Sequence, residues 1–318
     1  MIPKGQRLTR MLWAGGLAIM FLSWCLPQLM ERASLPLALV LIAGIGIPHG
    51  ATDQLLFLQM SRLVGKVQGL PVFYLAYLGL ILAYALLWFV FPWLGFVFFI
   101  ALSIYHFGQS DWDANLPRDA TNWPYFVCWG SFVLLTPVLW HYESSKPIVE
   151  AIVRAELPSW APSTYTGAAV ALPILNLCLL LWGVAVRRLS PEAFRVGLAQ
   201  LFFLLVLFIS TPLLLGFALY FAGWHALHSM QDQISFLRIA RGAYSWKHYV
   251  RDAAAFSLLA LAGIGAAIWF FRSGGLTEAL GVLFMGIAAI TLPHMILMDQ
   301  LYKRFGVNIH TGNEFFRG

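Results

Sequence analysis

The stretch from Arg195 to Gln231 reads RVGLAQLFFLLVLFISTPLLLGFALYFAGWHALHSMQ and contains one charged residue. A helix needs ~20 mostly apolar residues to cross the hydrocarbon core of a bilayer, so this run is too long for one crossing. The pair Thr211-Pro212 lies near its middle, and such a pair is typical of a turn. The run therefore predicts two membrane-spanning helices joined by a tight turn.

The rest of the chain has the composition of a membrane protein. Hydrophobic residues make up 60% of the 318 residues and charged residues only 11%. Soluble proteins have ~45–50% and ~25%, so these few charges could not cover a soluble globule. The three cysteines lie far apart in apolar segments, which argues against a disulfide framework or a zinc motif. The basic residues form no dense run, so the net charge of +6 does not indicate a nucleic-acid partner.

Apolar segments predict about ten membrane-spanning helices. The chain, residues 1–318, is therefore expected to be a single transmembrane domain, an all-α polytopic helix bundle without a separate soluble domain. The first segment is too long for a signal peptide and lacks a clear cleavage site, so we expect it to be a retained anchor. The predicted spans are 11–30, 36–58, 70–90, 92–111, 124–141, 167–186, 195–211, 212–231, 252–271 and 276–299.

The basic residues give an independent test of this count. If the N-terminus is cytoplasmic and the spans alternate, sixteen of the 20 Lys and Arg residues fall on inner segments. The outer segments hold only Arg32, Lys146, Arg154 and Arg272. This asymmetry is the one that the positive-inside rule expects. Both termini are therefore predicted to be cytoplasmic, with the protein a multi-pass component of the inner (plasma) membrane.

Four predicted spans carry histidines, which are costly inside a membrane and indicate function by default. The second, fourth, eighth and tenth spans contain IPHGATDQ, YHFGQSDW, WHALHSMQDQ and LPHMILMDQ. All four spans run in the same direction and each histidine falls in the second half, which predicts one layer of histidines in the cytoplasmic half of the membrane. Neutral imidazole is a good ligand for iron, copper or zinc. The candidate metal ligands are His49, His106, His225, His228 and His294.

Carboxylates follow these histidines, and we expect Asp53, Asp111 and Asp299 to act as outer partners of the ligands. Asp53 is one turn beyond His49 and could accept the free ring N–H of a metal-bound histidine, its own or a neighbour's. A single intramembrane histidine is often only a hydrogen bond between helices, but four sites at one depth favour a common centre. Aromatic residues beside the motifs are predicted to line an apolar substrate tunnel: Tyr105, Phe107 and Trp224.

The order and spacing of these motifs resemble those of the Brp/Blh family of membrane β-carotene 15,15'-dioxygenases. The motifs that carry the resemblance are HGATD, YHFGQSD, WH followed by a further histidine, and PH. The resemblance runs from about Pro48 to Asp299. It implies an enzyme that holds Fe(2+) on transmembrane histidines and uses dioxygen to cleave a carotenoid within the lipid bilayer, yielding retinal for a rhodopsin partner. Carried over by motif, the resemblance assigns His49, His106 and His225 as ligands.

The eighth span departs from the family motif, which reads WHSxRH. An ungapped comparison places Ser229 at the second histidine of that motif and His228 at its arginine. Residues three apart still share a helix face, so His228 could reach the metal. Alternatively, His294 supplies the fourth ligand.

Two other functions fit the same histidines. Paired histidines on facing helices can bind b-type haem in an electron carrier. Intramembrane histidine and aspartate can also relay protons or metal ions in a transporter, although no inverted repeat is visible in this sequence.

Overall fold

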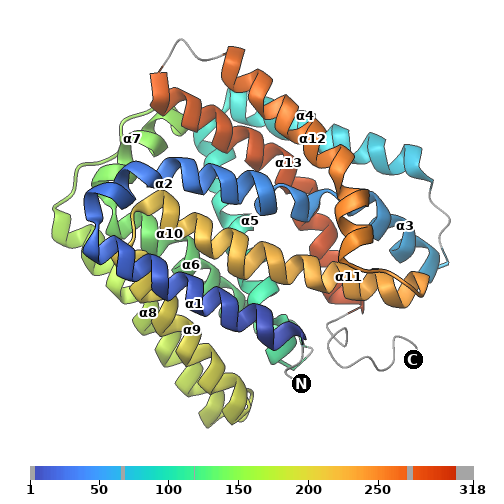
Figure 1. Cartoon of the computed structure of the whole chain (residues 1–318), viewed down its shortest axis with the longest axis horizontal. Coiled ribbons are helices and arrows are strands. Elements are labelled where there is room, and N and C mark those ends of the chain that lie inside the picture. The colour runs from blue at the N-terminus through green and yellow to red at the C-terminus, as the bar shows by residue number, and fades with distance from the viewer. Residues whose placement is uncertain (1–3, 66–68, 118, 271–274, 306–318) are drawn as a thin grey trace.

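Nine helices in the described part of the chain are long and apolar enough to cross a membrane. The computed structural model describes residues 4–65, 69–117, 119–270 and 275–305, and these residues include no strand. The helices pack side by side in one bundle, as Figure 1 shows. The predicted all-α polytopic fold is confirmed. The cytoplasmic placement of the termini stays a prediction, as does the assignment of the chain to a single domain.

Seven of the nine spans are largely regular helices, and two are composite. The seven are α4 (Leu70–Val90), α5 (Pro92–Trp112, extended by η3, Asp113–Asn115), α6 (Trp123–Trp140), α8 (Pro162–Ala185), α9 (Pro191–Ser210), α12 (Trp246–Phe270) and α13 (Gly275–Phe305). The composite spans are α2 (Pro27–Leu41) with η1 (Ile42–Gly46), η2 (Pro48–Gly50) and α3 (Asp53–Leu63), and α10 (Leu213–Leu219) with η5 (Tyr220–Ala226) and α11 (Leu227–Arg241). The remaining elements are α1 (Lys4–Cys25), η4 (Ala120–Asn122) and α7 (Tyr142–Val153).

Two predicted turns at prolines are confirmed. α4 ends at Val90 and α5 begins at Pro92, while α9 ends at Ser210 and α10 begins just after Pro212. Proline lacks the backbone N–H that a helix interior needs, so it is favoured where one helix stops and the next begins. The long run that contains Thr211-Pro212 therefore does divide into two spans.

The predicted boundary between the first two helices is wrong. α1 ends at Cys25 and α2 begins at Pro27, whereas the sequence predicted a connection between residues 30 and 36. Arg32, which the charge count placed on an outer segment, lies inside α2. Proline starts α2, as is common at the first helical position. The first predicted span corresponds to α1, which is 22 residues long but is not among the nine spans.

The two composite spans change their helical pitch beside two of the histidines. η1 is a π-helical turn that leads into the short 3-10 turn η2, which contains His49. Pro48 has no N–H to continue the α pattern, and the N–H of Ile47 donates to the Ile42 carbonyl at 2.7 Å, five residues back. η5 is a second π-helical segment and contains His225. Such π turns occur frequently at functional sites.

α5 and α6 approach each other closely through two glycines. A Cβ atom on Gly108 would lie 1.8 Å from the carbonyl oxygen of Phe126, and one on Gly130 would lie 1.7 Å from that of Ile104. Small residues at a helix interface let two backbones approach in a membrane. This contact fixes α5, the helix that carries His106.

We expect Gly108→Ala to destabilise the protein, because the added methyl group must separate α5 from α6. Overpacking of this kind costs about 1–3 kcal/mol. Thermal unfolding of the purified protein in detergent would measure the effect. The matched control is Gly79→Ala on α4, where a Cβ would meet no atom within 4 Å. Equal unfolding temperatures for the two variants would contradict the prediction.

Candidate metal and substrate site

Four histidines from four separate segments lie around a common centre. The ring centroid of His49 is 4.6 Å from that of His294 and 5.5 Å from that of His225. The centroid of His106 is 5.0 Å from that of His225 and 5.8 Å from that of His294. All four side chains are buried. The rings come from η2, α5, η5 and α13, so the bundle brings together residues that are far apart in the sequence.

Most of the ring nitrogens at this centre have no protein partner. Both nitrogens of His106, both of His225 and Nε2 of His294 are buried without a hydrogen bond among the described residues. Buried polar atoms are rarely left unpaired, so these five nitrogens need an explanation. A metal ion bound by neutral imidazoles would supply one.

The side chains are not already arranged as a coordination sphere. The described residues contain no group of three or more His, Cys, Asp or Glu side chains that could hold a metal ion as they stand. The chemistry of the unpaired nitrogens fits a metal centre, and the metal itself stays a prediction.

Two of the four rings are held in orientation by hydrogen bonds between their Nδ1 atoms and groups outside the histidine cluster. His294 Nδ1 lies 2.8 Å from Asp53 Oδ1, and His49 Nδ1 contacts the carbonyl oxygen of Gly46. Metal-bound histidines almost always donate their other ring N–H to a carboxylate or a backbone carbonyl. The structure thus places Asp53 against a neighbour's histidine, one of the two arrangements that its position in the sequence allowed.

The break in the α-helical pattern at η2 leaves the backbone carbonyl of His49 available to side chains, and two of them donate hydrogen bonds to it. Tyr249 Oη lies 3.0 Å from this oxygen and Gln233 Nε2 lies 2.8 Å from it. Thr52 donates in turn to Gln233 Oε1 at 2.7 Å. Sequence reasoning missed these supports. Gln233 closes the WHALHSMQDQ motif and could have been found, whereas Tyr249 resembles any packed aromatic of an apolar helix.

His228 lies outside the cluster. It is half-buried, and its Nδ1 contacts the carbonyl oxygen of Trp224 one turn back in the same helix. The structure therefore brings His294, and not His228, to the other three histidines.

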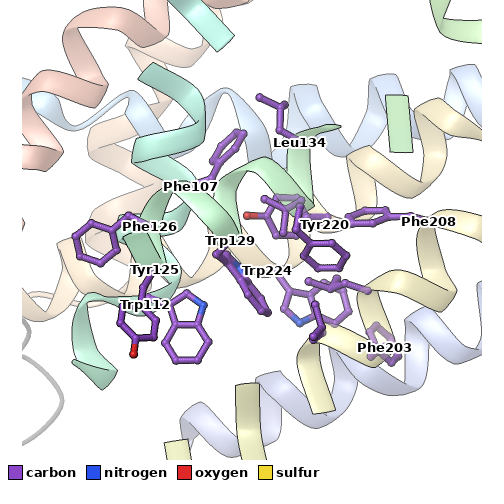
Figure 2. Close-up of a cluster of buried hydrophobic side chains, with 14 of the residues drawn as sticks. Phe107, Trp112, Tyr125, Phe126, Trp129, Leu134, Phe203, Phe208, Tyr220 and Trp224 are labelled. Carbon is purple, nitrogen blue, oxygen red and sulfur yellow. The ribbon is translucent and has the colours of Figure 1, made fainter. Parts of the chain in front are cut away.

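Asp111 and Asp299 also lie away from the histidine rings. Asp111 Oδ2 accepts from Trp129 Nε1 at 2.8 Å and from Tyr220 Oη at 3.0 Å. These two donors belong to the aromatic cluster in Figure 2. Asp299 accepts from Gln109 at 3.1 Å and pairs with Lys303 at 2.9 Å. Of the three predicted outer carboxylates, Asp53 is the one with a hydrogen bond to a clustered histidine.

An apolar cavity of about 420 Å³ begins at the four histidines. It extends between α5, α6, α7, α10 and α13, and almost all of its wall is aliphatic or aromatic. Cavities of ~300–1,000 Å³ hold elongated drug-sized molecules. The aromatic part of the wall includes Phe96, Phe99, Phe107, Phe217, Phe221 and Phe284.

The three aromatic residues predicted to line a tunnel have different positions. Phe107 lines the cavity and packs 4.6 Å from the ring of His225, centroid to centroid. Among the residues that the structure describes, Tyr105 and Trp224 do not line the cavity. Tyr105 packs on Phe126, and Trp224 packs on Phe203.

α7 covers the far part of the cavity with one face. Ser145, Ile148, Val149 and Ile152 line the cavity and recur at the spacing of one helix face. Glu150 points elsewhere, since it pairs with Lys146 at 3.8 Å and accepts from the Leu157 N–H at 2.8 Å. α7 is therefore a short amphipathic helix that closes one wall of the cavity.

Comparisons with known proteins point to one family. The model of the family described as "Beta-carotene 15,15'-dioxygenase" matches residues 40–302, which include all four clustered histidines. A protein of that name from an uncultured marine bacterium, 66A03, is 27% identical over 305 residues, covering 93% of this chain and all of the relative. A "Probable beta-carotene 15,15'-dioxygenase Blh" from Halobacterium salinarum is 27% identical over 289 residues, covering 82% of each chain. No solved structure matches.

Proposed function

Because the chain belongs to the beta-carotene 15,15'-dioxygenase family, we propose that it cleaves a carotenoid with dioxygen, with β-carotene as substrate and retinal as product. One molecule of β-carotene and one of dioxygen give two molecules of retinal, with the central carbon–carbon double bond broken and one oxygen atom added to each half. The names of both relatives support this reaction over a transporter or a haem-binding electron carrier.

The observation that carries the proposal is a cluster of four histidines at the end of an apolar cavity. We propose that His49, His106, His225 and His294 hold Fe(2+), because their rings surround one centre, three of them have unpaired buried nitrogens, and imidazole is a suitable ligand for iron. Bound iron would supply the activation of dioxygen, which does not react readily with a polyene alone.

The chain's own residues supply binding, orientation and exclusion of water. The aliphatic and aromatic wall buries a polyene, since it offers few polar groups that would retain water. Phe107 and Phe221 pack against His225 and would hold the reacting bond beside the cluster. Asp53 and the Gly46 carbonyl hold two of the rings in place, and the Asp53 carboxylate would offset the positive charge of a bound metal ion.

The proposed reaction takes place inside a multi-pass membrane protein. An apolar substrate dissolved in lipid would reach the cavity from the bilayer rather than from water. We further propose that the membrane is the inner (plasma) membrane. A functional link to a retinal-binding rhodopsin stays a prediction.

Expression in cells that accumulate β-carotene would test the proposal. We expect the orange colour to fade and retinal to appear in the pigment extract, and the purified protein to contain non-haem iron. Cells with an empty vector are the control. Unchanged carotenoid in cells that contain the folded protein would contradict the reaction, and an intense Soret band would favour the haem alternative.

A further inference from the structure

Tyr77 on α4 makes the next contact outward from the Asp53–His294 pair. Its hydroxyl donates to Asp53 Oδ2 at 2.8 Å and lies 3.4 Å from the carbonyl oxygen of Ile290 on α13. The other oxygen of Asp53, Oδ1, lies 2.8 Å from His294 Nδ1. A phenol, a carboxylate and an imidazole thus form one chain, which ends at the unpaired Nε2 of His294.

The carboxylate in this chain depends on its two partners. Asp53 is 2% exposed and His294 is 1% exposed, so bulk water reaches neither side chain. Among the described residues, no lysine or arginine pairs with Asp53, and the partner of its Oδ1 is the His294 ring. A buried carboxylate is costly unless donors satisfy its oxygens. Asp53 also begins α3, where the helix terminus favours negative charge.

Each of the two oxygens therefore has one side-chain donor. If the Tyr77 hydroxyl is removed, Oδ2 loses its donor and the carboxylate is free to turn about its side-chain bonds. Because His294 Nδ1 is held by the same carboxylate, its ring then loses its fixed orientation. The geometry at Tyr77 thus controls which way the Nε2 of His294 faces.

We propose that Tyr77 is a positioning residue of the metal centre. It fixes Asp53, and through Asp53 it keeps His294 with a protonated Nδ1 and an Nε2 lone pair directed to the other histidines. This inference rests on the metal centre of the proposed function. Loss of an outer partner of a metal ligand typically weakens metal affinity by about 10- to 100-fold, so that is the loss expected for Asp53→Asn and the upper limit for Tyr77→Phe, which acts through Asp53.

α4 provides a matched control for this substitution. Tyr84 lies two turns further along the same helix, is buried, and donates to the Gly95 carbonyl at 2.8 Å, away from the histidines. Tyr84→Phe removes the same hydroxyl from the same helix without touching Asp53.

Metal titration of the full chain, purified in detergent and freed of metal, would test the inference. Co(II) is the probe, because its visible absorption reports both binding and coordination. We expect Tyr77→Phe to bind Co(II) more weakly than the wild type, by no more than the about 10- to 100-fold of Asp53→Asn, and Tyr84→Phe to bind it as the wild type does. The double variant Tyr77→Phe/Asp53→Asn should bind no more weakly than Asp53→Asn alone, because the two residues act in one chain. Thermal unfolding of the metal-free variants would separate this effect from a general loss of packing.

The outcomes distinguish the two proposals. If the wild type binds Co(II) and Tyr77→Phe binds it equally well, the positioning role is overturned while the metal centre stands. A further loss on top of Asp53→Asn would also overturn that role, since Tyr77 would then act by another route. If the wild type binds no metal, the metal centre of the proposed function is itself overturned.

Discussion

Replacing His225 by alanine is expected to abolish retinal formation and metal binding together. Both ring nitrogens of His225 are buried and unpaired, and the side chain is fully buried among the other histidines. Even the outer partners of metal ligands are worth about 10- to 100-fold, so loss of a ligand should reduce activity by at least ~100-fold. Removal of an imidazole without hydrogen bonds leaves no partner unsatisfied, so the cost to folding is that of the cavity left behind, about 2–5 kcal/mol for a large-to-alanine change in a core. Retinal yield from β-carotene and iron content per chain are the measurements.

His228→Ala is the matched control, and it answers the question that the sequence left open. His228 lies three residues further along the same span, outside the cluster. Its replacement should preserve most of the activity, whereas His294→Ala should abolish it. Full activity in His225→Ala or His294→Ala, or complete loss in His228→Ala, would refute the ligand set drawn from the structure.

Filling the cavity is expected to block the substrate while sparing the metal centre. Thr291 lies one turn before His294 on α13, is half-buried and lines the cavity. Its hydroxyl bonds only within its own helix, to the Ile287 carbonyl at 2.9 Å and the Ala288 carbonyl at 3.2 Å. A tryptophan at this position has room in the free protein but would collide with a bound polyene. Overpacking costs about 1–3 kcal/mol, so the rate of retinal formation should fall about 10- to 100-fold.

The control for Thr291→Trp is Ile296→Trp, on the same helix. Ile296 is 40% exposed on the outer surface and does not line the cavity. Iron content should match the wild type in both variants, while retinal formation falls only in Thr291→Trp. Unimpaired cleavage by Thr291→Trp would show that the substrate does not occupy this cavity.

Much of the fold follows from hydropathy and proline. The lengths of the apolar segments located nearly all of the spans. Pro92 and Pro212 marked two turns that the lengths of these segments alone leave ambiguous. The α1–α2 boundary was missed: the charge count placed Arg32 on an outer segment, although a helix can carry a charged residue near its start. Charge marks the end of a membrane segment only approximately.

The site was less accessible to sequence reasoning. The histidine motifs, at one depth and in one direction, indicated a common centre, and the structure brings four of those histidines together. The choice between His228 and His294 needed the structure, because η5 departs from α-helical pitch at His225. Tyr77 and Tyr249 gave no signal, since a tyrosine's hydrogen bond depends on how its helix is rotated. α4 is apolar on every side, so its sequence does not show which face is turned inward.

The distribution of the four histidines has a consequence for biogenesis. They lie at positions 49, 106, 225 and 294, and the last of them is on α13, the final described helix. Chains fold from the N-terminus as they are synthesised. Three of the imidazoles are therefore inserted before the fourth, and the proposed metal centre can be completed only once α13 is in place. A nascent chain halted before α13 would carry three of the four histidines, and so an incomplete site for the proposed metal ion.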